Sequence, residues 1–396
     1  MHDQPAVPTP AALDAAAPVA VLERAADGPE RAGDEARPQF PPHSPLRREL
    51  NRRVAEYFTA TGKDERGGAA MLGKSAVIVA WAVTSYALLL LWASTWWTAA
   101  LLCGSLGLAL AGIGFSVMHD GGHGAYSRRP WVNRLAAAML DAIGGSSYFW
   151  RHKHNVLHHT FTNVEGIDDD IDAGPFLRMA ESQPLRWAHR FQHLYMVPLL
   201  GLFFATKWIL VDDLRSWHTG RVGGQAVPRP RGGEAVQLVA GKLCFLGWAV
   251  VLPLALHPPL HVALAYLLVA FVLGVTLGLV FQLAHCVEGT EFEAPGAPGA
   301  QLSRPFVEHQ LATTADFAPR SRLVTWYVGG LNFQVEHHLF PRISHLHYPA
   351  LAEIVRATCA ERGLVHRRHE TLWGALTSHV RFMRRLGRPR PAPLAG

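Results

Sequence analysis

Two long stretches without charged residues constrain the fold of this chain more than any other feature. Asp, Glu, Lys and Arg are all absent from residues 75–119 and again from residues 243–287, and each stretch is 45 residues long. An α-helix rises about 1.5 Å per residue, so each stretch corresponds to roughly 68 Å of helix. That length crosses the roughly 30 Å hydrocarbon core of a bilayer twice. The sequence therefore predicts two helical hairpins, with spans near residues 71–93, 97–118, 237–256 and 260–284.

The turns of these hairpins support a membrane location. Trp92, Trp96 and Trp97 lie in the middle of the first stretch, where an interfacial aromatic belt is expected. Pro258 and Pro259 break the second stretch. Neither turn contains Lys or Arg, whereas the flanking segments are rich in Arg, so the positive-inside rule places the flanks in the cytoplasm. A soluble protein is disfavoured, because buried core helices rarely run this long without a charge.

We therefore expect an all-α integral protein of the cytoplasmic (inner) membrane, with four transmembrane helices under a cytosolic helical cap. The cap comprises residues 119–236 and 285–380. Residues 1–45 are rich in Ala and Pro, and we expect a disordered tail without a cleavable signal peptide. Residues 45–62 have helical periodicity and are expected at the cytoplasmic surface. The membrane domain then covers residues 46–380, and residues 381–396 are expected to form a flexible basic tail.

A further apolar segment, residues 194–211, is ambiguous. It has the minimum length for a span, but Pro198 and Lys207 interrupt it. We expect an interfacial or re-entrant helix. A fifth span would separate the histidines that precede this segment from those that follow it, and no shared site would form.

Composition adds two constraints. The four cysteines are far apart and form no C-x-x-C pair, so neither a disulfide framework nor a thiolate cluster is expected. The isoelectric point near 9.3 follows from membrane topology alone, or marks a docking face for an acidic partner or anionic lipid. We expect no nucleic-acid partner.

Histidines gather in three short clusters and at one isolated position, each beside an apolar stretch. Pairs spaced i, i+4 on a helix point the same way, and imidazole suits iron, copper and zinc. Eight ligands are too many for one tetrahedral zinc ion, but they suit two iron ions with open positions for dioxygen. The eight candidate ligands are His119 and His123 in the first cluster, His154, His158 and His159 in the second, His337 and His338 in the third, and the isolated His285.

Two residues within the clusters are expected to support the ligands. Asp120 lies inside the first cluster, and carboxylates commonly orient metal-bound imidazoles by accepting the other ring N–H. Gln334 lies one turn before His338 and is expected to hold a water or a ligand imidazole. An acidic run at residues 168–172 either braces nearby Arg or Lys residues or is a solvated loop or helix cap.

The remaining histidines have other expected roles. His189 and His193 share the i, i+4 spacing but have no third imidazole nearby, so they are expected at the surface or the membrane interface. His309 is expected behind the ligands or facing substrate. Five others are not expected to be ligands. His152 faces away from the second cluster, and His345 and His347 follow the third cluster. His366 and His369 lie in a solvated basic stretch.

These clusters resemble the three histidine boxes of the membrane fatty acid desaturases. The matching segments are GFSVMHDGGHG at residues 114–124, KHNVLHHTFTN at 153–163 and NFQVEHHLFP at 332–341. The resemblance extends from about residue 56 to residue 361 and is closest to bacterial acyl-CoA or acyl-lipid desaturases of the linoleoyl-CoA type. Gln334, where many relatives have His, is similar to the front-end desaturases, which act between an existing double bond and the carboxyl end.

The resemblance implies a di-iron centre held by the eight histidines and an O2-dependent removal of two hydrogens from a long acyl chain linked to CoA or lipid. One position departs from the stearoyl-CoA type, which carries Asn four residues before the isolated histidine, where this chain has Phe281. The His-Pro-Gly-Gly motif of the haem domain in many eukaryotic front-end enzymes is not found. A separate electron donor is therefore implied, a ferredoxin or a b-type cytochrome with its reductase.

Two alternatives remain at this point. A di-iron hydroxylase or monooxygenase of the same superfamily would act on lipid or hydrocarbon substrates, although the third cluster and its Leu-Phe-Pro sequel favour desaturation. A metal transporter would need ionisable groups within its spans, and the two charge-free stretches contain no Asp, Glu, Lys or Arg.

Overall fold

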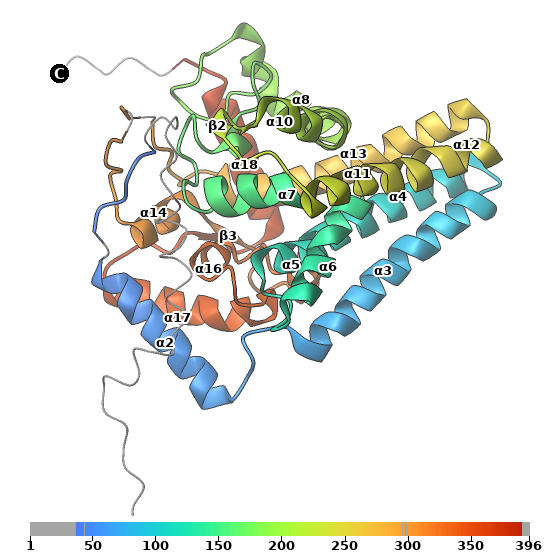
Figure 1. Ribbon diagram of the computed structural model, residues 1–396. Helices are drawn as coiled ribbons and strands as arrows, with labels where there is room; N and C mark the ends of the chain where they lie inside the picture. Colours follow the sequence, from blue (N-terminus) through green and yellow to red (C-terminus); the bar gives the residue numbers. More distant parts are fainter. Residues whose placement is uncertain (1–36, 43, 295, 298, 390–396) are drawn as a thin grey trace, which may run out of the picture.

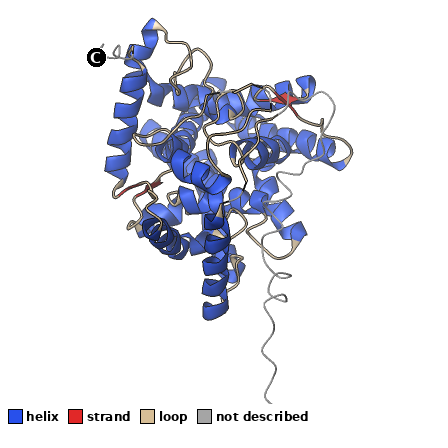
Figure 2. Ribbon diagram, turned by 90° about the vertical axis from the view of Figure 1, so that its left-hand side faces the viewer, coloured by secondary structure: helices blue, strands red, loops and turns tan. Residues whose placement is uncertain are grey.

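The computed structural model describes residues 37–42, 44–294, 296–297 and 299–389. Within these residues the chain is mostly helical, and its only sheets are two pairs of two-residue strands. Figure 1 shows a bundle of long helices that projects from a cap of shorter ones, and Figure 2 shows how few strands the cap contains. The expected N-terminal tail falls mostly outside the described residues.

Four helices in the described part are long and apolar enough to cross a membrane, and they lie within a few residues of the predicted spans. The first is α3 (Gly68–Leu91). The second consists of α4 (Trp96–Gly112), η2 (Ile113–Met118) and α5 (His119–His123), and the third of α11 (Gly233–Leu246), η8 (Gly247–Val251) and α12 (Leu252–Leu256). The fourth is α13 (Pro259–His285). The chain is thus a four-helix membrane protein, as predicted.

Small residues allow the spans to pack closely. Gly107 of α4 faces α13, where an added Cβ would lie 2.8 Å from the side chain of Val272. Between spans, such close approach of backbones replaces the hydrophobic drive that water would supply. The exposed faces of the spans carry leucines and valines, which suits contact with lipid tails.

The ambiguous segment forms one bent helix that lies against α13. It runs through α8 (Gln192–Leu199), η6 (Leu200–Phe204), α9 (Ala205–Lys207), η7 (Trp208–Asp212) and α10 (Asp213–Thr219). Gly274 of α13 touches it so closely that a Cβ would lie 2.4 Å from the carbonyl oxygen of Leu200. The second and fourth spans end in one shared cluster of histidines, so an even number of crossings is expected between their ends. Among the described residues, this segment is not one of the helices long and apolar enough to cross a membrane, and its interfacial or re-entrant position stays a prediction.

The cap consists of short helices with two small sheets. Strand β1 (Arg221–Val222) pairs antiparallel with β2 (Gln225–Ala226), and β3 (Asp316–Phe317) pairs in parallel with β4 (Arg368–His369). The helices of the cap are α2 (Pro45–Thr61), α6 (Pro130–Ala142), α7 (Ser147–Trp150), η3 (Arg151–His158), η4 (Asp169–Ile171), η5 (Trp187–Phe191), α14 (Phe306–Thr313), α15 (Arg322–Tyr327), α16 (Gln334–Leu339), η9 (His345–His347), α17 (Tyr348–Glu361) and α18 (Leu372–Leu386).

Both expected tails are shorter than predicted at the ends that the structure describes. Phe40 packs against Phe161 and Phe306, so the chain joins the fold before residue 45. At the other end α18 continues to Leu386, and Phe382 is buried. The apolar residues of α18 keep their helical spacing past residue 380, whereas the predicted tail rested on the basic, Pro-containing composition of this segment.

Candidate metal centre

Four helix ends bring the eight candidate histidines together. His119 and His123 lie on α5 at the end of the second span, and His285 is the last residue of α13. The second cluster lies on and just after η3, and the third lies on α16. All eight side chains are buried. Close packing explains the Gly-Gly pair of the first cluster, since a Cβ on Gly122 would lie 2.2 Å from the ring of Trp150.

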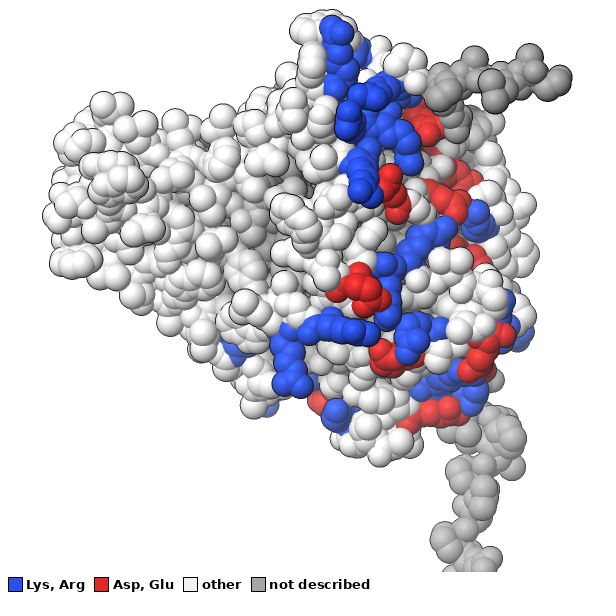
Figure 3. Space-filling model, turned by 180° about the vertical axis from the view of Figure 1, so that it is seen from behind, with Lys and Arg blue, Asp and Glu red and all other residues white. Residues whose placement is uncertain are grey.

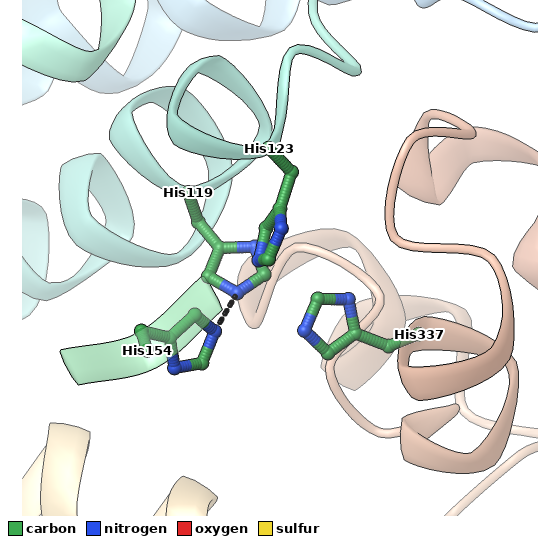
Figure 4. A group of neighbouring side chains, drawn as sticks. All are labelled: His119, His123, His154 and His337. Carbon is green, nitrogen blue, oxygen red and sulfur yellow. Dashed lines mark hydrogen bonds between the residues drawn. The ribbon is translucent and has the colours of Figure 1, made fainter. Parts of the chain in front are cut away.

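The first group combines His119, His123, His154 and His337. One ring nitrogen of each lies within 4.8 Å of the others. Figure 4 shows the four rings, from α5, η3 and α16, facing a common centre. The Nε2 atoms of His119 and His154 are 3.2 Å apart, which is the separation that two ligands of one metal ion would have.

The second group combines His158, His285 and His338, with ligand nitrogens again within 4.8 Å of one another. Gln334 enters this group, because its side-chain nitrogen lies 2.9 Å from Nε2 of His285 and 3.3 Å from Nε2 of His338. His159 lies between the two groups. Its ring centroid is 4.5 Å from that of His337 and 4.3 Å from that of His338.

The outer nitrogens of the second group and of His337 are held by other residues. Nδ1 of His158 lies 3.0 Å from Asp168, and Nδ1 of His338 lies 2.8 Å from Oε1 of Gln310. Nδ1 of His337 lies 3.1 Å from the hydroxyl of Tyr348. When Nδ1 is the donor in such a bond, the lone pair of Nε2 points inward, which is the arrangement found in histidine metal ligands.

The inward nitrogens fit metal ions. Among the described residues, Nε2 of His123, His158 and His337 is buried without a hydrogen-bond partner, and such unpaired groups are rare in native proteins. Burial lowers the pKa of His154 and of His337 well below the usual value, so these imidazoles are neutral and present a lone pair. Burial also acts on His158, but the carboxylate of Asp168 outweighs it and raises the pKa of His158.

Asp120 holds a different partner from the one expected. Its carboxylate lies 2.9 Å from Nδ1 of His345 and accepts a hydrogen bond from the hydroxyl of Ser344 at 3.1 Å. Lys74 lies 2.7 Å from the other ring nitrogen of His345. Asp120 therefore ties the first cluster to the loop after the third, and no hydrogen bond to an imidazole of the two groups is found for it within the described residues.

Sequence reasoning missed the residues that hold the outer nitrogens. The acidic run does brace a lysine, since Lys153 pairs with Asp169 and Asp170 at 3.0 Å. Its first member, Asp168, instead holds His158. The position of Asp168 ten residues after a candidate ligand was the available signal, whereas nothing local marked Gln310 or Tyr348.

Two other histidines are placed differently from the expectation. His189 is buried rather than at the surface; its ring bonds the backbone of Arg186 and Pro175, both at 3.1 Å. His366 is not part of a solvated basic face, because its side chain is only 4% exposed and lies 3.0 Å from Glu336. Pairing of β3 with β4 turns this segment inward.

Two histidines take roles that were expected. His309 is buried behind the second cluster, with Nε2 2.9 Å from the carbonyl oxygen of Thr162. His152 directs Nδ1 to the carbonyl oxygen of Tyr148 at 3.0 Å and belongs to neither group.

The four cysteines are all free.

Comparison with known proteins identifies the family. A family model described as fatty acid desaturase matches residues 94–370. The chain belongs to the fatty acid desaturase family. This desaturase is 36% identical over 342 residues to an sn-1 linoleoyl-lipid 6-desaturase of Arthrospira platensis. The aligned residues make up 86% of this chain and 92% of the relative. The sn-1 linoleoyl-lipid 6-desaturase of Synechocystis sp. is 36% identical over 344 residues, which make up 87% of this chain and 96% of the relative.

A more distant relative agrees. An acyl-lipid (8-3)-desaturase of Physcomitrium patens is 34% identical over 342 residues, covering 85% of this chain and 71% of the relative. The protein is therefore a membrane enzyme, an oxidoreductase that desaturates fatty acyl chains.

Proposed function

We propose that this desaturase uses O2 and two iron ions to insert a double bond into a long acyl chain of a membrane lipid, between an existing double bond and the carboxyl end. The names of the relatives support a lipid-linked substrate. Gln334 in the third cluster supports the front-end position of the new bond. The Arg-rich flanks of the spans support a cytoplasmic location for the cap of this inner-membrane enzyme.

The observation that carries this proposal is the pair of buried imidazole groups on either side of His159. His119, His123, His154 and His337 would hold one iron, His158, His285 and His338 the other, and His159 completes the set of eight. Bound iron would supply the activation of dioxygen, and the protein supplies ligation, orientation and exclusion of water.

The stoichiometry requires a partner. Removal of two hydrogens from the acyl chain and reduction of O2 to two water molecules leave two electrons and two protons to be provided. We expect them from a separate donor, a ferredoxin or a b-type cytochrome with its reductase, that docks on the cytoplasmic side.

Phe281 packs against the second group on the side that faces the membrane. Its ring centroid lies 5.0 Å from that of His158 and 4.8 Å from that of His285. An aromatic ring at this position excludes water where a polar residue would hold it. An acyl chain that enters between the spans would meet an apolar wall at the second group, and such walls determine where a chain stops.

The experiment is expression in a host with a simple lipid profile that is supplied with linoleate, followed by mass spectrometry of the lipids. We expect a loss of two hydrogens and a new double bond on the carboxyl side of the existing ones. A gain of one oxygen would instead identify the hydroxylase, and a new bond on the methyl side would refute the front-end assignment.

A matched pair of variants tests the metal centre. His154→Ala should abolish product and lower the bound iron of the purified protein, whereas His152→Ala, two residues earlier and outside both groups, should leave both unchanged. Equal iron content in the two variants would refute the ligand assignment.

A further inference from the structure

The exposed face of α18 changes character along its length. Its first half presents apolar side chains, including Trp373, which is 77% exposed. Its last turns present exposed arginines, and one more follows the helix end; these are Arg381, Arg384, Arg385 and Arg388. The opposite face is buried through Phe382 and Met383. The helix is therefore amphipathic, but its outer face is basic at one end only.

A second segment extends this basic face. Gln192 donates its amide to the carbonyl oxygen of Met383 at 2.8 Å, so the start of α8 is docked on α18. The preceding residues expose two arginines, Arg186 and Arg190, beside Trp187, which is 74% exposed, and Leu194 within α8 is 67% exposed. We call these six arginines with Trp187, Phe191 and Leu194 the α18 basic surface.

The charges of this surface are not neutralised within the described chain. None of the six arginines is among the arginines of the described residues that have an Asp or Glu partner within 4.0 Å. Two of them lie on aromatic rings instead, Arg190 over Trp187 at 5.5 Å and Arg385 over Phe382 at 5.3 Å. Six cations on two packed segments repel one another, and an anionic ligand would relieve that repulsion.

The location of the surface indicates which anion it meets. His379 of α18 lies 2.7 Å from the carbonyl oxygen of Cys286, directly after the end of the fourth span. Figure 3 shows Lys and Arg gathered in a band where the uncharged body that carries the spans meets the part of the molecule with Asp and Glu. Lipid phosphates lie at this level of a bilayer, and the combination of Arg with exposed Trp, Phe and Leu is typical of helices that lie in the headgroup region.

We propose that the α18 basic surface binds the headgroups of anionic phospholipids and so fixes the cap against the membrane. An acidic redox protein is the other class of anion to consider. Its contact would have to cover Trp187 and Leu194 next to the bilayer, whereas these side chains enter a lipid surface without rearrangement. This inference does not depend on the metal centre or on the position of the new double bond.

The test uses the full chain purified in a non-ionic detergent and titrated with dioleoylphosphatidylglycerol or dioleoylphosphatidylcholine, with bound lipid counted by native mass spectrometry. The test variant changes Arg381, Arg384, Arg385 and Arg388 to Gln. A control variant removes the same charge from exposed residues of α2, α17 and the loops that follow them, by changing Arg48, Lys63, Arg356 and Arg362 to Gln. A third variant changes the four α18 arginines to Lys.

We expect the wild type, the control and the Lys variant to retain phosphatidylglycerol over phosphatidylcholine, and the Gln variant to bind phosphatidylglycerol about tenfold more weakly. Equal retention by the wild type and the Gln variant would overturn the proposal, as would an equal loss in the control. It would also be overturned if the Gln variant kept its lipid but lost salt-sensitive binding of an acidic ferredoxin, since the surface would then belong to the electron donor.

Discussion

Asp168 holds both His158 and the loop that follows it. One carboxylate oxygen lies 3.0 Å from Nδ1 of His158 and accepts the backbone N–H of Asn163 at 2.9 Å, while the other accepts the backbone N–H of Asp170 at 3.1 Å. Both side chains are buried. A single carboxylate thus fixes the ring of one proposed ligand and the backbone around it. Its negative charge makes the imidazole a stronger electron-pair donor to a metal ion.

The first prediction concerns this carboxylate. Asp168→Asn keeps the shape but removes the charge, and we expect the iron affinity of the purified protein to fall by about 10- to 100-fold. Bound iron is measured by elemental analysis during titration with a chelator. Asp172→Asn is the matched control, because Asp172 lies in the same run but is exposed, and in the described chain its carboxylate accepts only the backbone N–H of Gly174. An unchanged iron affinity in Asp168→Asn would contradict the role assigned here.

The second prediction concerns Gln334. Its amide lies beside Nε2 of both His285 and His338, so an imidazole at this position would add a nitrogen to the second group. Gln334→His should therefore keep or increase bound iron but reduce desaturation by about 100-fold or more, since an open metal position would be filled. Gln334→Met removes the amide without adding a ligand and separates the two effects. Wild-type turnover in Gln334→His would refute the idea.

The spans and the histidine clusters could be predicted because their signals are local. A run without charges identifies a span by itself, and the i, i+4 spacing of His119 and His123 fixes their common direction. The partners of the ligands could not be predicted, because they come from distant parts of the chain. Gln310 reaches His338 only after α14 packs beside α16, and no pattern around Gln310 marks that contact.

The same cause explains the two histidines whose surroundings were predicted wrongly. His366 stands beside Arg367 and Arg368 and has the sequence context of a solvated residue, yet the pairing of β3 with β4 places it against buried carboxylates. His189 lies in an amphipathic stretch, but its ring bonds the backbone of Arg186 at the start of η5 and of Pro175. Tertiary contacts determine the burial of both histidines, and the local composition does not reveal those contacts.

The third prediction concerns the packing of α13. Gly274→Ala would place a Cβ 2.4 Å from the carbonyl oxygen of Leu200, so the backbone of one helix must move. We expect a destabilisation of about 1–3 kcal/mol, the usual result of overpacking, measured as a lower thermal unfolding midpoint in detergent. Gly104→Ala is the control in another span, where a Cβ meets nothing within 4 Å. It should be neutral or stabilise by up to about 1 kcal/mol. Equal midpoints for the two variants would show that the contact with Leu200 is not tight.

The fourth prediction concerns acid sensitivity of the contact between α18 and the fourth span. His379 is buried, its Nδ1 lies 2.7 Å from the carbonyl oxygen of Cys286, and its Nε2 has no partner among the described residues. Burial lowers the pKa of His379 from about 6.5 to about 4. Between these two pH values the unfolded chain binds a proton that the folded chain does not, so stability is complete above about pH 6.5 and is lost as the pH falls toward 4.

The size of this effect follows from the difference between the two pKa values, which corresponds to roughly 3 kcal/mol at most. We expect the thermal unfolding midpoint of His379→Gln to fall less between pH 7.5 and pH 5.0 than that of the wild type. The buried imidazoles of the two metal-binding groups respond to acid in both proteins, so their contribution cancels in the difference. His218→Gln changes an exposed histidine and should follow the wild type. If His379→Gln also follows the wild type, burial of His379 does not control the acid stability of this contact.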